Sequence, residues 1–156
     1  MSERPTDEHV MQWHRWFAVE CNNAAWALAE QEQRTEDEDR QMLASAYASV
    51  FHWSKVGTPE NAAHGDLLLG QVHALLGHGQ LALQHAERSF AWIMGNARPD
   101  WERAFAHAIL AHAAARAGRA DLHSTHHRHA QAVGETLDPE DRAIFEASFR
   151  LIPSPA

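Results

Sequence analysis

Cysteine, lysine and β-branched residues are scarce in this sequence. Cys21 is the single cysteine among 156 residues, which excludes an intrachain disulfide and a cysteine-rich zinc site. Because β-branched residues are few and no alternating apolar pattern persists, the sequence does not predict strands. The longest apolar run, residues 104–115, is too short to span a bilayer. We therefore expect an all-α protein with one domain.

Sequence signatures of common enzymes are also absent. No glutamate directly follows a histidine, and the single lysine, Lys55, lacks the glycine loop of a phosphate-binding site. No serine lies in a nucleophile elbow, and we expect Cys21 to be a small packed residue. The amino terminus does not resemble a secretory signal, so we expect a cytoplasmic location. We also expect no cofactor and no membrane association.

Negative charge is concentrated near the start of the chain. The net charge is −8 with histidine neutral, and residues 1–39 hold ten acidic against three basic side chains. An acidic surface repels phosphate backbones, so we expect no nucleic-acid partner at neutral pH. Protonation of all 13 histidines would reverse the sign of the net charge, so mild acid should alter association or solubility.

The clearest structural unit is a helical hairpin at residues 51–94. Thr58-Pro59-Glu60 predicts a helix start, because the threonine hydroxyl can cap free N–H groups and proline suits the first turn. Gly77-His78-Gly79 predicts a chain reversal. A second helix should run from about residue 80 to 94 and end at Gly95.

This unit resembles the 34-residue tetratricopeptide repeat, in which small and large residues recur at fixed places. The matching positions are Leu69-Gly70 at the small-residue site, His73, the turn at Gly77, Ala82, Ala86 and Ser89-Phe90. Gly118 is an equivalent turn, but it lies 41 positions after Gly77, so the helices should be longer than those of a standard repeat. The strings HWSKVGTPENAAHG, NNAAW and EDRAIFEASF also resemble a group of bacterial helical-repeat-like proteins with no assigned activity.

The remaining segments predict further helices. The first should run from about residue 7 to 33. Spacings of three and four join its apolar residues into one stripe, made of Val10, Trp13, Phe17, Cys21, Ala24 and Leu28. Trp16 and Trp26 lie off this stripe, where they could contact a neighbouring helix or a second subunit. Thr35 to Glu38 reads as a capping box, and Asp138-Pro139 as another helix start.

Together these patterns predict one domain over residues 1–156 with about seven helices. We expect antiparallel hairpins near residues 7–55, 59–94 and 100–135 in a tetratricopeptide-like right-handed stack. A capping helix should follow at residues 139–151.

The resemblance implies a non-enzymatic scaffold that binds an unknown protein or peptide. If the repeat register holds, four side chains should face the concave side: His64, Gln71, His112 and Arg116. Six tryptophans make exposed aromatic surface an expectation, which favours association into a homodimer.

Histidines supply the alternative hypotheses. His52 and Lys55 could form a polar site at a groove mouth, although satisfying carbonyls at a helix end is the preferred interpretation. His123 and His127 lie one helical turn apart, yet a third metal ligand is missing, so we expect a helix surface and no metal site. A histidine-dependent small-molecule or metal-binding enzyme, using Glu20, Asp39 or Glu102, is the competing function.

Overall fold

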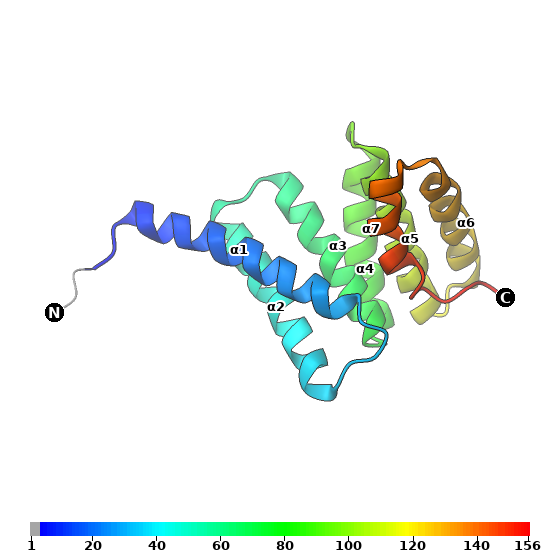
Figure 1. The fold of residues 1–156 in the computed structure, drawn as a ribbon, viewed down its shortest axis with the longest axis horizontal. Helices are drawn as coiled ribbons and strands as arrows, with labels where there is room; N and C mark the ends of the chain where they lie inside the picture. Colours follow the sequence, from blue (N-terminus) through cyan, green and yellow to red (C-terminus); the bar gives the residue numbers. More distant parts are fainter. Residues whose placement is uncertain (1–3) are drawn as a thin grey trace.

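The computed structural model describes residues 4–156, and the regular structure in that range is helical (Figure 1). Within these residues seven helices follow one another: α1 (Asp7–Ala29), α2 (Glu36–Val56), α3 (Pro59–Leu75), α4 (Gly79–Met94), α5 (Asp100–Arg116), α6 (Ala120–Thr136) and α7 (Pro139–Phe149). The described residues contain no strand, and none of their helices is long and apolar enough to cross a membrane. The prediction of an all-helical fold is confirmed.

Side-chain caps determine where several helices begin. Thr35 and Glu38 form the predicted capping box of α2, in which each side chain accepts a hydrogen bond from the other residue's backbone N–H. Thr58 caps α3 and Asp138 caps α7, in each case directly before a proline. These three predicted helix starts are confirmed. They could be predicted because a cap involves residues only a few positions apart.

Gly77 and Gly118 form two turns of the same geometry. Their φ angles are +77° and +73°, in the left-handed region that favours glycine. After each glycine the next N–H bonds back into the preceding helix, from His78 to the His73 carbonyl and from Arg119 to the Ala114 carbonyl, both at 2.8 Å. The α3–α4 and α5–α6 connections are therefore equivalent in their backbone.

Neighbouring helices approach closely at small residues. A Cβ atom added to Gly70 of α3 would lie 3.2 Å from the backbone nitrogen of Ala86 in α4. One added to Gly79, at the start of α4, would lie 2.6 Å from the carbonyl carbon of Arg116 at the end of α5. Such contacts bring backbones together at distances that larger side chains would prevent.

Two apolar cores lie on either side of α3. One extends over α3 to α7 and the C-terminal segment, with Leu67 and Ile109 among its buried residues. The other joins α1, α2 and α3 through residues such as Met42 and Leu68. Trp26 of α1 packs against both cores, and α7 packs against α5 and α6.

The predicted apolar stripe of α1 is wrong in its orientation. The buried residues of this helix are Ala18, Ala25 and Ala29, whereas Trp13 and Phe17 are exposed. The Ser49 hydroxyl of α2 donates a hydrogen bond to the Ala18 carbonyl at 2.8 Å, a contact that needs close approach. The small residues therefore face α2, and the aromatic residues are turned toward other surfaces. The helix also ends at Ala29 and not near residue 33, with Arg34 bonded to the Gln31 carbonyl at 3.0 Å.

Replacing Gly79 by alanine should destabilise the protein. The added methyl group would meet the backbone of Arg116, so α4 and α5 must separate, which costs about 1–3 kcal/mol. Gly95→Ala is the matched control, because the neighbours of its added Cβ belong to α4 itself and a change within about 0.5 kcal/mol is expected. Urea unfolding monitored by circular dichroism measures both. Equal midpoints for Gly79→Ala and the parent protein would contradict the close approach.

Candidate functional site

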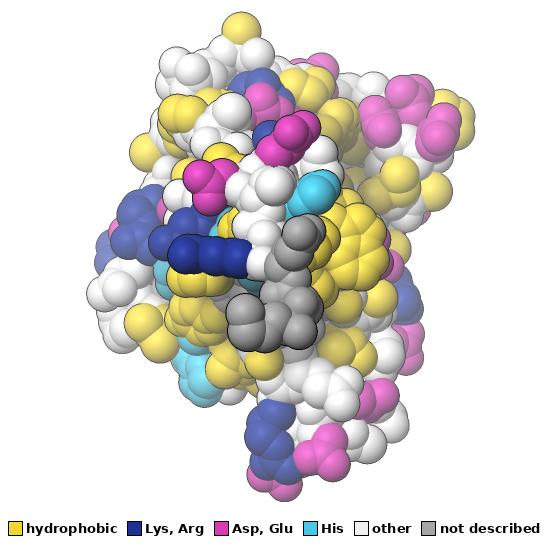
Figure 2. Space-filling model, turned by 90° about the vertical axis from the view of Figure 1, so that its left-hand side faces the viewer, with side chains coloured by type: hydrophobic (Ala, Val, Ile, Leu, Met, Phe, Trp, Pro, Cys, Tyr) yellow, Lys and Arg dark blue, Asp and Glu magenta, His cyan; other side chains and the backbone are white. Residues whose placement is uncertain are grey.

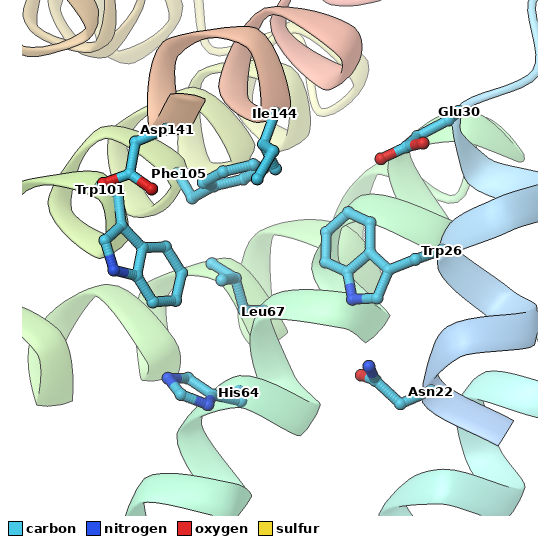
Figure 3. Close-up of a pocket in the computed structure, with 9 residues that line it drawn as sticks. All are labelled: Asn22, Trp26, Glu30, His64, Leu67, Trp101, Phe105, Asp141 and Ile144. Carbon is cyan, nitrogen blue, oxygen red and sulfur yellow. The ribbon is translucent and has the colours of Figure 1, made fainter. Parts of the chain in front are cut away.

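A cleft of about 530 Å³ lies where α1, α3, α5 and α7 converge (Figure 3). Each of these helices contributes side chains to it. The lining residues are Asn22 and Trp26 from α1, Glu30 directly after it, His64 and Leu67 from α3, Trp101 and Phe105 from α5, and Asp141 and Ile144 from α7. The volume is within the range of about 300–1,000 Å³ that is typical of ligand sites.

Aromatic side chains form the walls of the cleft. The indole rings of Trp26 and Trp101 lie on opposite sides of Leu67 (Figure 3). Phe105 contacts both of them edge to face, with ring centroids 6.1 Å from Trp26 and 6.3 Å from Trp101. Phe105 is itself buried and packs against Phe145 of α7 at 5.6 Å. The two indoles are therefore supported by a core residue, which limits their movement.

Polar groups surround these walls. The carboxylates of Glu30 and Asp141 lie along one side of the cleft, while Asn22 and His64 lie along the other (Figure 3). Among the residues that line the cleft there is no lysine or arginine. An apolar interior with an acidic edge suits a ligand that combines apolar surface with positive charge.

An ion-pair network lies beside His64. Glu102 is buried and receives two hydrogen bonds from the Arg98 guanidinium, at 2.8 and 2.5 Å. Arg98 also bonds to Glu60 of α3 at 2.5 Å. This network joins the α4–α5 loop to the beginning of α3, directly next to the cleft.

The same network determines the charge of Glu102. Burial alone would raise the pKa of this carboxyl group, but the hydrogen bonds and charge of Arg98, with the His64 imidazole 3.4 Å away, outweigh burial and hold its pKa below the ordinary value. Hydrogen bonding to Glu102 in turn raises the pKa of Arg98. The buried carboxylate is therefore ionised and paired at neutral pH.

Glu60, His64 and Glu102 also have the spacing of metal ligands. Among the described residues, they are the group whose ligand atoms all lie within 4.8 Å of one another. However, the Arg98 guanidinium already bonds to both carboxylates and supplies the positive charge there. We therefore interpret this cluster as an ion-pair network that supports the cleft.

The structure separates the four residues predicted to line a groove. His64 lines the cleft, whereas Gln71 and His112 are buried, with the His112 Nδ1 and Gln71 Oε1 atoms 3.3 Å apart. Arg116 is exposed and borders a separate hollow of about 440 Å³ beside the C-terminal segment. Direct packing of α3 on α5 covers Gln71 and His112.

The other predicted polar residues each have contacts of their own, and the His123 and His127 rings lie 6.0 Å apart between centroids. His52 lies against α1, with its Nδ1 atom 2.8 Å from that of His14, and Lys55 is placed over the Phe51 ring at 4.9 Å. Burial, followed by the neighbouring His14, lowers the pKa of His52. His123 bonds to the Pro153 carbonyl at 2.7 Å, and His127 packs on Phe149 with ring centroids 4.8 Å apart.

Two histidine groups lie outside the cleft. In the first, His73 lies between other polar rings, with Tyr47 Oη 2.8 Å from its Nε2 atom and His78 Nδ1 3.0 Å from its Nδ1 atom. In the second, His107 of α5 lies against His126 and His129 of α6, with ring centroids 5.2 and 5.0 Å away. His73 is a buried core residue with Tyr47 as a hydrogen-bond partner.

Sequence reasoning missed most of the cleft. Trp26 carried a usable signal, because it lies off the predicted stripe, and its predicted contact with a neighbouring helix is confirmed by Phe105. The sequence around the other wall residues does not distinguish a cleft wall from an ordinary helix surface. These residues are Trp101, Asp141 and Ile144. Their position depends on how α5 and α7 pack.

We compared the chain with protein-family models, curated proteins and solved structures. No protein-family model, curated protein or solved structure matched the chain. The fold and the cleft therefore define an all-helical protein with an aromatic, acidic-edged cleft.

Glu102→Gln should destabilise the protein most clearly at neutral pH. Neutralising the buried carboxylate leaves Arg98 with a weaker partner, at a cost of about 1–3 kcal/mol. Because folding lowers the pKa of Glu102, its stabilising effect is present above the unfolded value near 4.5 and is lost as the pH falls through the folded pKa. Urea unfolding from pH 7 to 3 should show the difference from the parent protein shrinking. A constant difference would contradict an ionised Glu102.

Mild acid should destabilise the whole protein. Burial, followed by neighbouring positive charge, lowers the pKa of His73 and His107 to about 4 and that of His112 to about 3. The unfolded chain binds these protons near pH 6.5, so the free energy of unfolding should fall as the pH drops from about 7 to 4. The folded protein therefore resists protonation of these three histidines, whereas the composition alone would allow all 13 histidines to become charged in acid.

His112→Gln provides the test of this pH dependence. Denaturant unfolding at several pH values should show a smaller slope of stability against pH for the variant, whose glutamine cannot titrate. His9→Gln, which changes an exposed histidine, should keep the slope of the parent protein. An unchanged slope in His112→Gln would contradict a buried neutral imidazole.

Proposed function

We propose that this protein is a non-catalytic binding module that holds a segment of a protein or peptide in the cleft between α1, α3, α5 and α7. The observation that supports this function is the pair of indole walls, Trp26 and Trp101, with acidic groups at the edge. Large aromatic side chains anchor many recognition surfaces, because each buries a large area at small cost in conformational entropy.

The ligand chemistry follows from the lining. A bulky apolar side chain fits between the indoles and Leu67, and a neighbouring lysine or arginine can pair with Glu30 or Asp141. Such an ion pair at a solvent-exposed edge contributes about 0–1 kcal/mol, so apolar burial supplies most of the affinity and charge selects among segments. The preferred ligand is therefore a segment in which a basic residue adjoins a large apolar one.

We place this module among tetratricopeptide-like stacks of helical hairpins. Three observations support this proposal: the equivalent turns at Gly77 and Gly118, the close approach of Gly70 to Ala86, and the contact between Gln71 and His112. The last two residues are 41 positions apart, as are the two turn glycines, so successive hairpins place corresponding residues side by side. In this arrangement α7 caps the stack and closes one wall of the cleft.

A histidine-dependent enzyme has weaker support. His64 is the one histidine in the cleft lining, and its nearest carboxylate, Glu102, is engaged by Arg98. A nucleophilic role for Cys21 is also disfavoured, because burial and the nearby Glu20 raise the pKa of its thiol and reduce the thiolate fraction. The cleft offers walls for binding but does not pair a nucleophile with a free base.

Selection from a displayed library of random peptides tests this function. Peptides that combine basic and large apolar residues should be enriched. Trp26→Ala and Trp101→Ala should each weaken binding by about tenfold or more, because each removes an anchor of the cleft. Fluorescence anisotropy with the selected peptides measures these affinities.

Trp16→Ala is the matched control for that experiment. Trp16 is an exposed tryptophan on the same helix as Trp26 but does not line the cleft, so affinity should be unchanged. Failure to select any peptide, or equal loss in all three variants, would overturn the proposed role of the cleft.

A further inference from the structure

One exposed face of α1 carries an ordered series of large and small residues. Along this face, which we call the α1 stripe, exposed positions recur at spacings of one helical turn: His9, Trp13, Trp16, Phe17, Glu20, Ala24 and Ala27. Trp13, Trp16 and Phe17 are 52%, 58% and 43% exposed. The large residues occupy the N-terminal half of the stripe, and the alanines occupy the C-terminal half. All seven positions are exposed, and Phe17 also contacts His52 of α2.

The aromatic half continues onto α2. The Phe17 ring stacks on His52, with centroids 5.5 Å apart, and His52 contacts Phe51, which is 54% exposed. Figure 2 shows hydrophobic side chains gathered at this end of the molecule. Exposed aromatic residues that contact one another form a continuous apolar patch, and such patches mark interfaces.

We propose that the α1 stripe binds the same stripe of a second copy of this chain in an antiparallel dimer. A two-fold axis near Glu20 would place Trp13 opposite Ala27 of the partner and Trp16 opposite Ala24, since each pair is equidistant from residue 20. Large side chains would then pack over small ones at both ends. The order of sizes along one helix thus makes the surface complementary to itself.

The exposed aromatic area supplies part of such an interface. Aromatic side chains bury about 150–250 Å² each, so covering the exposed parts of the three stripe aromatics and Phe51 removes roughly 300–500 Å² per copy. A standard interface buries about 800 Å² per partner. The aromatic side chains therefore supply roughly half of the area of a standard interface.

The effect of the Glu20 charge distinguishes this dimer from binding of a basic protein at the same face. In the antiparallel pair, the two Glu20 carboxylates lie together at the axis and repel each other. The acidic N-terminal regions of both copies add to this repulsion. Aromatic burial must therefore outweigh a like-charge cost, and removing that cost should tighten the dimer. A basic partner would instead depend on these negative charges.

Sedimentation velocity across micromolar to millimolar concentrations tests the proposal. The parent protein should show a monomer–dimer equilibrium. Glu20→Gln should lower the dimer Kd by about two- to fivefold, and added salt should also tighten the dimer through screening. Glu8→Gln is the control on the same helix. Its exposed carboxylate lies off the α1 stripe, so a smaller effect is expected.

Two further substitutions locate the interface without disturbing the core, because both positions are exposed. Trp16→Ser should raise the Kd at least tenfold, since a two-fold interface loses the side chain twice. Ala24→Trp should block dimerisation by filling the space that the partner's Trp16 would occupy. A monomer at every concentration would overturn the proposal. A dimer that is insensitive to these substitutions, or one weakened by Glu20→Gln, would also overturn it.

Discussion

Close approach of helices through alanine and glycine is the constraint on which this structure depends. Ala18 meets Ser49 between α1 and α2, Gly70 meets Ala86 between α3 and α4, and Gly79 meets the backbone of Arg116. At each contact, a larger side chain would force the backbones apart. Small residues therefore hold the helices in register, and the bulky side chains must lie elsewhere.

The positions of the aromatic residues follow from this constraint. Because alanines fill the contact between α1 and α2, Trp26 is turned toward α5, where it meets Phe105 and forms one wall of the cleft. Trp13 and Trp16, on another face of the same helix, are left exposed. One packing rule thus produces an internal aromatic cleft and an external aromatic surface. These are the two features on which the proposed peptide binding and dimerisation rest.

Electrostatics then stabilise the cleft and limit its chemistry. Arg98 joins Glu60 and Glu102, so the buried carboxylate beside His64 is already paired and contributes to structure. Glu30 and Asp141 are not part of that network, and they give the edge of the cleft its negative charge. The separation of paired and accessible carboxylates favours recognition of cationic segments over catalysis.

Local sequence predicted local structure well, and tertiary packing accounts for what it did not predict. Thr35, Thr58 and Asp138 marked helix starts correctly, because a cap involves residues a few positions apart. The orientation of α1 was not predictable from periodicity, since small and large residues both recur at helical spacing. The burial of Gln71 and His112 depends on contact between α3 and α5, and the cleft depends on side chains from four helices. Those arrangements have no signature in any short segment.

NMR of the tryptophan indole N–H groups provides the most direct test of the central claim that the cleft is the binding site. On addition of a selected basic and apolar peptide to ¹⁵N-labelled protein, the resonances of Trp26 and Trp101 should shift, while those of Trp53 and Trp92, which do not line the cleft, should remain in place. Shifts confined to tryptophans outside the cleft would contradict the account.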